Sequence, residues 1–285
     1  MFSLPLSIHS RRCVLAAVLL MGLSGVRSAK AAELTYPLSV AAGSDGTIYI
    51  ADLKLPGVWK AKDGKLEIYF QASNKFGSPL NGVRCITLDG EGKLLAGDSA
   101  TREVYRFDDA GKPQPLTNGG IGMPQGIAVA EDGTLYVSDL ETHAIYKVPS
   151  AGGEAKTFAA VKGPLGLVFD ADKNLMVVSR QGKLIKVNSE GQAEAWGEGG
   201  FKFAQGIAAG PEKSWYVSDS YAGSVLKVGA DGKSSPYING EPLKGPVGLA
   251  VSGEKLFVAD PKVPGIFAVS ADGKVEKLPL SVEVK

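Results

Sequence analysis

Residues 123–139 read MPQGIAVAEDGTLYVSD. Two short apolar runs, at residues 127–129 and 135–137, flank the polar turn Glu131-Asp132-Gly133. A glycine that follows an acidic residue accepts the positive φ of a tight turn, which makes this pattern a strong hairpin signal. The stretch therefore predicts two short antiparallel strands joined by a tight turn.

The same unit recurs six times along the chain. Its closing polar residue falls at Asp52, Asp98, Asp139, Ser179, Asp219 and Asp260, with separations of 46, 41, 40, 40 and 41 residues. Two weaker apolar runs follow the closing residue, as at residues 144–148 and 154–159. A period near forty residues with several strands per unit is typical of a β-propeller. The sequence thus predicts an all-β fold, a six-bladed β-propeller with four antiparallel strands per blade, over residues 32–285.

The first 31 residues have the pattern of an export signal. Arg11 and Arg12 precede an apolar stretch at residues 14–26, and Ala29-Lys30-Ala31 matches a cleavage site. The apolar stretch is too short to span a bilayer comfortably, so we expect a cleaved signal helix and no membrane insertion afterwards. The arginine pair fits the twin-arginine route, and an ordinary secretory signal fits equally well. We therefore expect a periplasmic or secreted protein.

Charge and composition exclude several classes of function. Without residues 1–31 the chain loses four basic and no acidic residues, which leaves 27 basic against 30 acidic residues and no attraction for nucleic acid. Cys85 is then the one remaining cysteine, so an internal disulfide is impossible. His143 is the one remaining histidine, which excludes a zinc site built from several histidines.

The closing aspartates have a structural and a functional interpretation. A carboxylate at the end of a strand can accept hydrogen bonds from the N–H groups of the following turn. This favours Asp52, Asp98, Asp139, Asp219 and Asp260 as structural caps of the repeat. Under the alternative interpretation, Asp98, Asp139 and Asp219 are the candidate ligands of a divalent cation.

A candidate site follows from the geometry of the repeat. The first strand of a propeller blade is innermost, and the residue before the motif glycine (Gly126 and its counterparts) emerges at the same end of the blade as the closing aspartate. The six residues at this position are Leu38, Arg84, Gln125, Leu165, Gln205 and Val247. With Arg180, which follows Ser179, they predict an amphipathic mouth suited to a small polar or anionic ligand. Pairing of Arg84 with Asp98 or Asp52 remains an equally good explanation of that arginine.

The units closely resemble NHL repeats, as in Pro124-Gln125-Gly126 and in His143, which falls on that family's usual histidine. The wider superfamily includes gluconolactonase-like and strictosidine-synthase-like proteins. The resemblance to the former implies a metal-dependent lactone or ester hydrolase with Ca²⁺ at the mouth. This chain has Leu38 where that family has a glutamate, and Gln125, Leu165 or Gln205 where it has asparagine.

Two functional hypotheses follow. The favoured one is a non-catalytic exported propeller that binds a small molecule or a protein at its mouth, without a cofactor and as a monomer. The alternative is the metal-dependent hydrolase. The favoured hypothesis rests on Arg84, because a cation site needs several acidic oxygen ligands and the predicted mouth offers a guanidinium instead.

Overall fold

The computed structural model describes Met1 and residues 33–73, 75 and 77–282. The predicted signal segment and its helix, apart from Met1, lie outside the described residues. No helix in the described part of the chain is long and apolar enough to cross a membrane.

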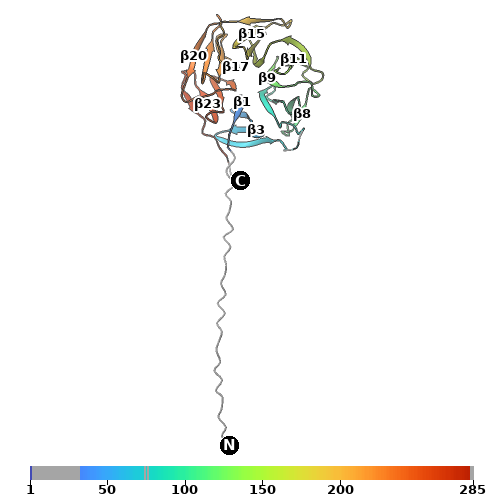
Figure 1. Ribbon diagram of the computed structural model, residues 1–285, viewed down its shortest axis with the longest axis vertical. Coiled ribbons are helices and arrows are strands. Elements are labelled where there is room, and N and C mark those ends of the chain that lie inside the picture. Colours follow the sequence, from blue (N-terminus) through green and yellow to red (C-terminus); the bar gives the residue numbers. More distant parts are fainter. Residues whose placement is uncertain (2–32, 74, 76, 283–285) are drawn as a thin grey trace. The chain divides into compact units, whose positions relative to one another are not determined.

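The described residues form six antiparallel blades arranged in a ring (Figure 1). The strands of the first three blades are β1 (Pro37–Ala42), β2 (Ile48–Asp52), β3 (Leu55–Lys62) and β4 (Lys65–Gln71); β5 (Val83–Leu88), β6 (Leu94–Asp98), β7 (Glu103–Phe107) and β8 (Pro113–Pro115); and β9 (Pro124–Val129), β10 (Leu135–Asp139), β11 (Ala144–Val148) and β12 (Lys156–Ala160). Those of the last three are β13 (Pro164–Phe169), β14 (Leu175–Ser179), β15 (Lys183–Val187) and β16 (Ala193–Trp196); β17 (Ala204–Ala209), β18 (Trp215–Asp219), β19 (Ser224–Val228) and β20 (Ser234–Asn239); and β21 (Leu249–Ser252), β22 (Lys255–Asp260), β23 (Gly265–Val269) and β24 (Val275–Lys277).

Each blade is a meander of four consecutive strands, so the predicted fold class is confirmed. The first strand of each blade lies innermost, and its start faces the end of the second strand. Pro124 pairs with Asp139, for example, and Val83 pairs with Asp98. We call the end of the ring where the inner strands begin the front face. The loops that join strands two and three of a blade, and those that join one blade to the next, lie on this face.

Side chains between neighbouring blades make up the hydrophobic core. The buried residues fall into six clusters, one for each pair of adjacent blades. Trp196 and Trp215 form an edge-to-face contact between blades four and five, with ring centroids 4.9 Å apart. Trp59 is 1% exposed between blades six and one. These three tryptophans therefore contribute to the contacts between neighbouring blades.

The motif glycines allow the inner strands of neighbouring blades to approach closely. A Cβ atom on Gly206 would lie 2.3 Å from the carbonyl oxygen of Val247, and one on Gly166 would lie 2.8 Å from that of Gln205. Side-chain hydroxyls add hydrogen bonds across the same interfaces. Ser138 Oγ donates to the Leu165 carbonyl at 2.6 Å, and Ser218 Oγ donates to the Val247 carbonyl at 2.6 Å.

The ring closes with a short extra strand that the repeat does not predict. β25 (Ser281–Val282) runs parallel to β4 and forms a fifth strand at the outer edge of the first blade. Ser281 pairs with Lys65, and Val282 pairs with Leu66. Blades one and six are therefore complete within their own repeats, and the end of the chain binds the first blade from outside.

Candidate functional site at the front mouth of the channel

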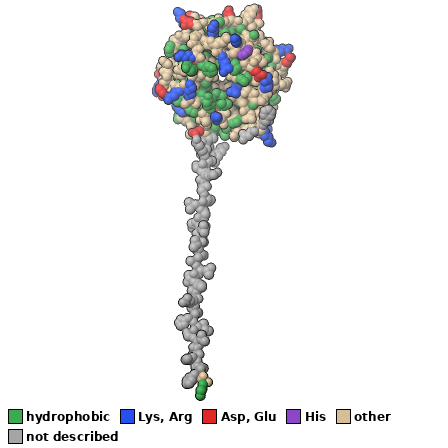
Figure 2. Space-filling view, viewed as in Figure 1, with side chains coloured by type: hydrophobic (Ala, Val, Ile, Leu, Met, Phe, Trp, Pro, Cys, Tyr) green, Lys and Arg blue, Asp and Glu red, His purple; other side chains and the backbone are tan. Residues whose placement is uncertain are grey.

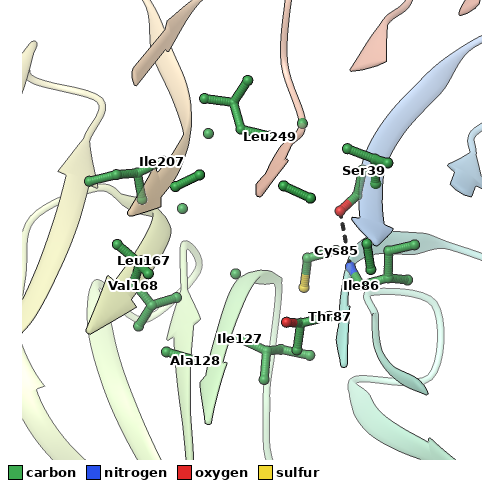
Figure 3. Close-up of a pocket in the computed structure, with 18 of the residues that line it drawn as sticks. Ser39, Cys85, Ile86, Thr87, Ile127, Ala128, Leu167, Val168, Ile207 and Leu249 are labelled. Carbon is green, nitrogen blue, oxygen red and sulfur yellow. Dashed lines mark hydrogen bonds between the residues drawn. The ribbon is translucent and has the colours of Figure 1, made fainter. Parts of the chain in front are cut away.

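A central channel with a volume of about 610 Å³ is lined by the inner strand of every blade. Figure 3 shows these strands around the open space, with Ile207, Leu249 and Leu167 on three of them. Each inner strand pairs with a neighbour on one side only, so its other backbone edge faces the channel. Ser39 Oγ, on the inner strand of blade one, accepts a hydrogen bond from the Ile86 N–H on the inner strand of blade two at 3.1 Å.

The closing aspartates are buried and accept several backbone hydrogen bonds each. Asp139 accepts from the N–H groups of Gly122, Met123 and Glu141 at 2.8–2.9 Å. Asp52, Asp98, Asp219 and Asp260 accept the corresponding bonds in their own blades. Each carboxylate thus joins the loop that enters its blade to the turn after the second strand.

Burial and hydrogen bonding act in opposite directions on Asp139. Burial alone would raise the pKa of this carboxyl, but the N–H groups of Met123, Gly122 and Glu141 outweigh burial and lower the pKa below the usual 3.8. The ionised form is therefore the one that the blade stabilises.

Arg84 and Gln205 lie at the front mouth, on blades two and five, which are opposite each other in a ring of six. Arg84 Nε donates to Ser99 Oγ at 3.1 Å, and Gln205 Nε2 donates to Ser220 Oγ at 3.0 Å. Ser99 in turn donates to the carbonyl of Gly82 at 3.0 Å. Each polar side chain is thus oriented by the serine that follows the closing aspartate of its own blade.

The structure shows no ion pair between Arg84 and either Asp98 or Asp52. In the described part of the chain, the oxygens of these two aspartates accept hydrogen bonds from backbone N–H groups and from Thr101. The guanidinium is half-buried and lines the channel, and its hydrogen-bond partner among the described residues is Ser99. Its remaining donors are available to a ligand that enters the mouth.

The other ring positions complete an amphipathic mouth. Gln125 is half-buried and lies next to Arg84 in blade order, and both line the channel. Leu165 and Val247 are each 5% exposed, and Leu38 is half-buried. Blades two, three and five therefore contribute polar side chains, and blades four, six and one contribute aliphatic ones.

Arg180 is not among the residues that line the channel. It is exposed on the front face, where its guanidinium carbon lies 5.8 Å from the centroid of the Phe203 ring. The sequence predicts Arg180 at the mouth with the six ring residues, but in the structure its side chain lies outside the channel.

Cys85 replaces the motif glycine in blade two and is packed tightly. It is 4% exposed, and burial raises the pKa of its thiol to about 12. Its register partner is Gly97, where a Cβ atom would lie 2.7 Å from Cys85 Sγ and 2.8 Å from Pro124 Cβ. Blade three has Gly126 opposite Ser138 at the same place, so the larger residue is on the inner strand in blade two and on the second strand in blade three.

His143 serves the turn between β10 and β11. It adopts a φ of 57°, and its Nδ1 accepts a hydrogen bond from the Gly163 N–H at 3.2 Å. The imidazole thereby joins the turn to the loop that enters blade four.

The donor set does not fit the divalent cation that gluconolactonase-like proteins imply. Within the described ranges, no three His, Cys, Asp or Glu side chains come together as a metal site. The oxygens of Asp98, Asp139 and Asp219 accept backbone N–H groups, and a cation would have to displace these bonds. Arg84 would add a positive charge beside it.

Sequence reasoning missed Ser99 and Ser220. Both follow a closing aspartate, at Asp98-Ser99 and Asp219-Ser220, while Leu53, Leu140, Arg180 and Pro261 occupy the position in the other blades. The signal was present: serine occurs at this position in the two blades whose ring residues are Arg84 and Gln205.

Exposed charges divide between the two faces of the ring. The front loops and the segment before β1 contain the exposed basic residues Lys54, Lys75, Arg102, Lys162, Arg180, Lys202, Lys244 and Lys262, against Glu33, Glu141, Glu198 and Glu241. The turns at the opposite end contain the exposed acidic residues Asp45, Asp63, Glu91, Asp109, Glu131, Asp132, Glu154, Asp172, Glu190, Glu212, Asp231, Glu254 and Asp272, against Lys112, Lys173, Lys213, Lys233 and Lys274.

Figure 2 shows one face of the ring, on which basic and hydrophobic side chains gather around the middle and most acidic ones lie toward the margin. Among the residues of the front loops and of the segment before β1, Tyr36, Leu53, Phe203 and Tyr221 are exposed hydrophobic residues, so the front face combines basic side chains with exposed apolar ones.

No model of a known protein family matches the chain. NHL-repeat-containing protein 4 from Homo sapiens is 31% identical over 113 residues, which are 38% of this chain and 87% of that protein.

Solved propellers of several kinds superpose on most of the chain. Virginiamycin B lyase from Staphylococcus aureus has a TM-score of 0.67 at 16% identity, and the match covers 88% of each chain. A gluconolactonase from Xanthomonas campestris has a TM-score of 0.68 at 17% identity, covering 81% of this chain and 84% of that one. A chain of a nidogen/laminin complex has a TM-score of 0.66 at 16% identity, covering 85% and 92%. Similarity at this level concerns the fold.

Proposed function

This chain belongs to the NHL-repeat proteins, and on that premise we propose that it is a binding protein whose ligand, a small molecule with an anionic group, enters the front mouth of the channel. The observation that carries the proposal is the state of Arg84. Its guanidinium is fixed by Ser99, is half-buried in the channel and has no carboxylate partner among the described residues. A half-buried cation without a counter-ion is poised to bind one.

The ring residues restrict the shape of the ligand. Arg84 and Gln125 come from adjacent blades and would hold a carboxylate, because both side chains offer N–H donors. Val247 and Leu38, on blades six and one, would contact an apolar part of the same molecule. We therefore propose a small amphipathic carboxylate as the ligand class, bound outside the cytoplasm as residues 1–31 predict.

The experiment uses the mature chain and hexanoate and phenylacetate as probes, with hexanamide and hexylamine as neutral and cationic controls. Isothermal titration calorimetry should detect the carboxylates and neither control. Arg84→Gln should weaken carboxylate binding at least about tenfold, which corresponds to about 1.4 kcal/mol.

Arg102→Gln is the matched control. Arg102 also lies on the front face, but it pairs with Glu141 at 2.7 Å outside the channel. Its variant should bind the carboxylates as the parent chain does. Unchanged affinity in Arg84→Gln, or equal loss in both variants, would reject the mouth as the site. Metal analysis of the same sample addresses the hydrolase alternative, since a stoichiometric divalent cation would overturn the preference for simple binding.

A further inference from the structure

The front face of blade five and its two neighbours exposes aromatic rings beside basic side chains. Tyr221 is 74% exposed and Phe203 is 36% exposed. We call the surface formed by Arg180, Lys202, Phe203, Tyr221 and Lys262 the blade-five rim. It lies outside the channel, since none of these five residues lines it.

Contacts join the five residues into one continuous surface. Arg180 lies over the Phe203 ring at 5.8 Å, and Lys202 Nζ lies 6.0 Å from the centroid of the Tyr221 ring. The Ser220 N–H donates to the Phe203 carbonyl at 3.1 Å, and Lys262 Nζ donates to the Ser220 carbonyl at 2.9 Å. Three successive blades thus contribute to the rim, with Ser220 at its centre.

The backbone beneath the rim is held in place by Asp219. This carboxylate is 2% exposed and accepts the N–H groups of Lys202 at 2.7 Å, Phe203 at 3.1 Å and Ala222 at 3.0 Å. The two loops that present the aromatic rings are therefore fixed to a single buried group. A surface ordered in advance loses less conformational entropy when a partner binds.

The composition of the rim matches the centre of a protein interface. Tyrosine, phenylalanine and arginine are enriched in such interfaces, and exposed aromatic rings are frequent hot spots. The three charged members of the rim are all basic, and the front loops around it contain more exposed basic than acidic residues. Charge complementarity then requires an acidic partner with apolar side chains that cover the rings.

We propose that the blade-five rim docks an acidic segment of another protein, in which carboxylates alternate with large apolar residues. The apolar residues of the segment would cover Tyr221 and Phe203, and its carboxylates would meet Arg180, Lys202 and Lys262. This interface is distinct from the small-molecule site at the mouth. It does not depend on Arg84.

The test measures fluorescence anisotropy of a fluorescein-labelled synthetic peptide in which glutamate alternates with leucine and phenylalanine. The parent protein should bind this peptide, and should not bind a peptide of equal charge with serine at the apolar positions. Tyr221→Ala and Lys202→Glu should each weaken binding about tenfold, and added salt should weaken it further.

Two control variants test whether the effect belongs to the rim. Tyr36 is also an exposed aromatic residue at 38%, and Lys54 is an exposed front-face lysine, both on blade one. Tyr36→Ala and Lys54→Glu make the same chemical changes elsewhere on the face and should leave peptide affinity within twofold of the parent. All variants should retain the parent far-ultraviolet circular dichroism spectrum and melting temperature, because the altered side chains are exposed.

Several outcomes would overturn the proposal: no binding beyond that of the serine peptide, equal losses in the blade-one controls, or stronger binding to phosphatidylglycerol vesicles than to the peptide. Arg84→Gln separates this proposal from the previous one. It should weaken carboxylate binding at the mouth and leave peptide binding intact, so either site can fail while the other stands.

Discussion

At the scale of single residues, positions that are the same in most blades show what each blade needs structurally, and positions that differ between blades mark local features of one blade. The aspartates at the closing positions recur because each blade needs its entering loop joined to its second strand. Cys85 departs from the pattern, and the structure compensates for it at Gly97 across the strand pair. Arg84 also differs from its counterparts in the other blades, and Ser99, which accepts its hydrogen bond, differs from the residues at the same position in most blades.

The Cys85–Gly97 pair makes a prediction about stability. Gly97→Ser should destabilise the fold by about 1–3 kcal/mol, because the new Cβ would overlap Cys85 Sγ and Pro124 Cβ. Combining it with Cys85→Gly recreates the glycine and serine of blade three. The double variant should be less destabilised than the sum of the two single variants, as urea unfolding would measure. Additive losses would show that the two positions do not share this space.

Asp139 predicts a dependence of stability on pH. Burial opposes ionisation, but the bound N–H groups lower the folded-state pKa below the ordinary 3.8. A depressed carboxyl pKa contributes stability above the unfolded-state value, and this contribution is lost as the pH falls through the folded-state pKa. Asp139→Asn should therefore cost about 1–3 kcal/mol at neutral pH.

The difference between the parent and Asp139→Asn should shrink as the pH falls below 3.8, because protonation weakens the same hydrogen bonds in the parent. Chemical denaturation at neutral and acidic pH measures both quantities. A constant difference across that range would contradict the role assigned to the ionised carboxylate.

At the scale of elements, each blade is a local product of its own forty residues, and the contacts between blades need small residues and hydroxyls. Gly206 and Ser218 illustrate both, since one admits the next strand and the other bonds to it. β25 is the exception, because it joins the last repeat to the first through backbone pairing.

Removal of β25 tests its contribution. A chain that ends at Leu280 loses the pairing of Ser281 with Lys65 and of Val282 with Leu66. We expect the melting temperature to fall by about 2–4 °C, as for a loss of about 1 kcal/mol in a protein of this size. Amide exchange at Leu66 should become faster. A chain that ends at Val282 keeps the strand and is the control; equal melting temperatures for the two would show that β25 adds nothing.

At the scale of the whole molecule, the sequence predicts the ring well and the site only in part. The spacing of the closing residues is enough to place Leu38, Arg84, Gln125, Leu165, Gln205 and Val247 around one channel, because antiparallel pairing fixes which end of a strand they occupy. The resemblance to NHL repeats is also confirmed.

What the sequence could not predict depends on packing between segments that are distant along the chain. β8 consists of Pro113, Gln114 and Pro115, which lack a strand pattern and pair with β7 only through the geometry of the blade. The Arg84 side chain can reach either Ser99 or a nearby aspartate, depending on its rotamer. The sequence pattern does not indicate which of these rotamers is adopted, and the structure shows the hydrogen bond to Ser99. Tyr221 is 74% exposed and lies beside Lys202, and this contact joins two loops whose relative position the repeat does not specify.

The way the ring closes leaves the order of the blades open to rearrangement. Every blade is built from one uninterrupted stretch, and Leu34 and Val282, near the two ends of the described chain, pack against the same core cluster. Joining those ends and opening the polypeptide at the loop before Ile121 would preserve all six sheets and turn the present seam into an ordinary connection. The order of the blades along the chain is therefore not essential to the fold. A circularly permuted gene could start at any of the blades and encode the same six sheets.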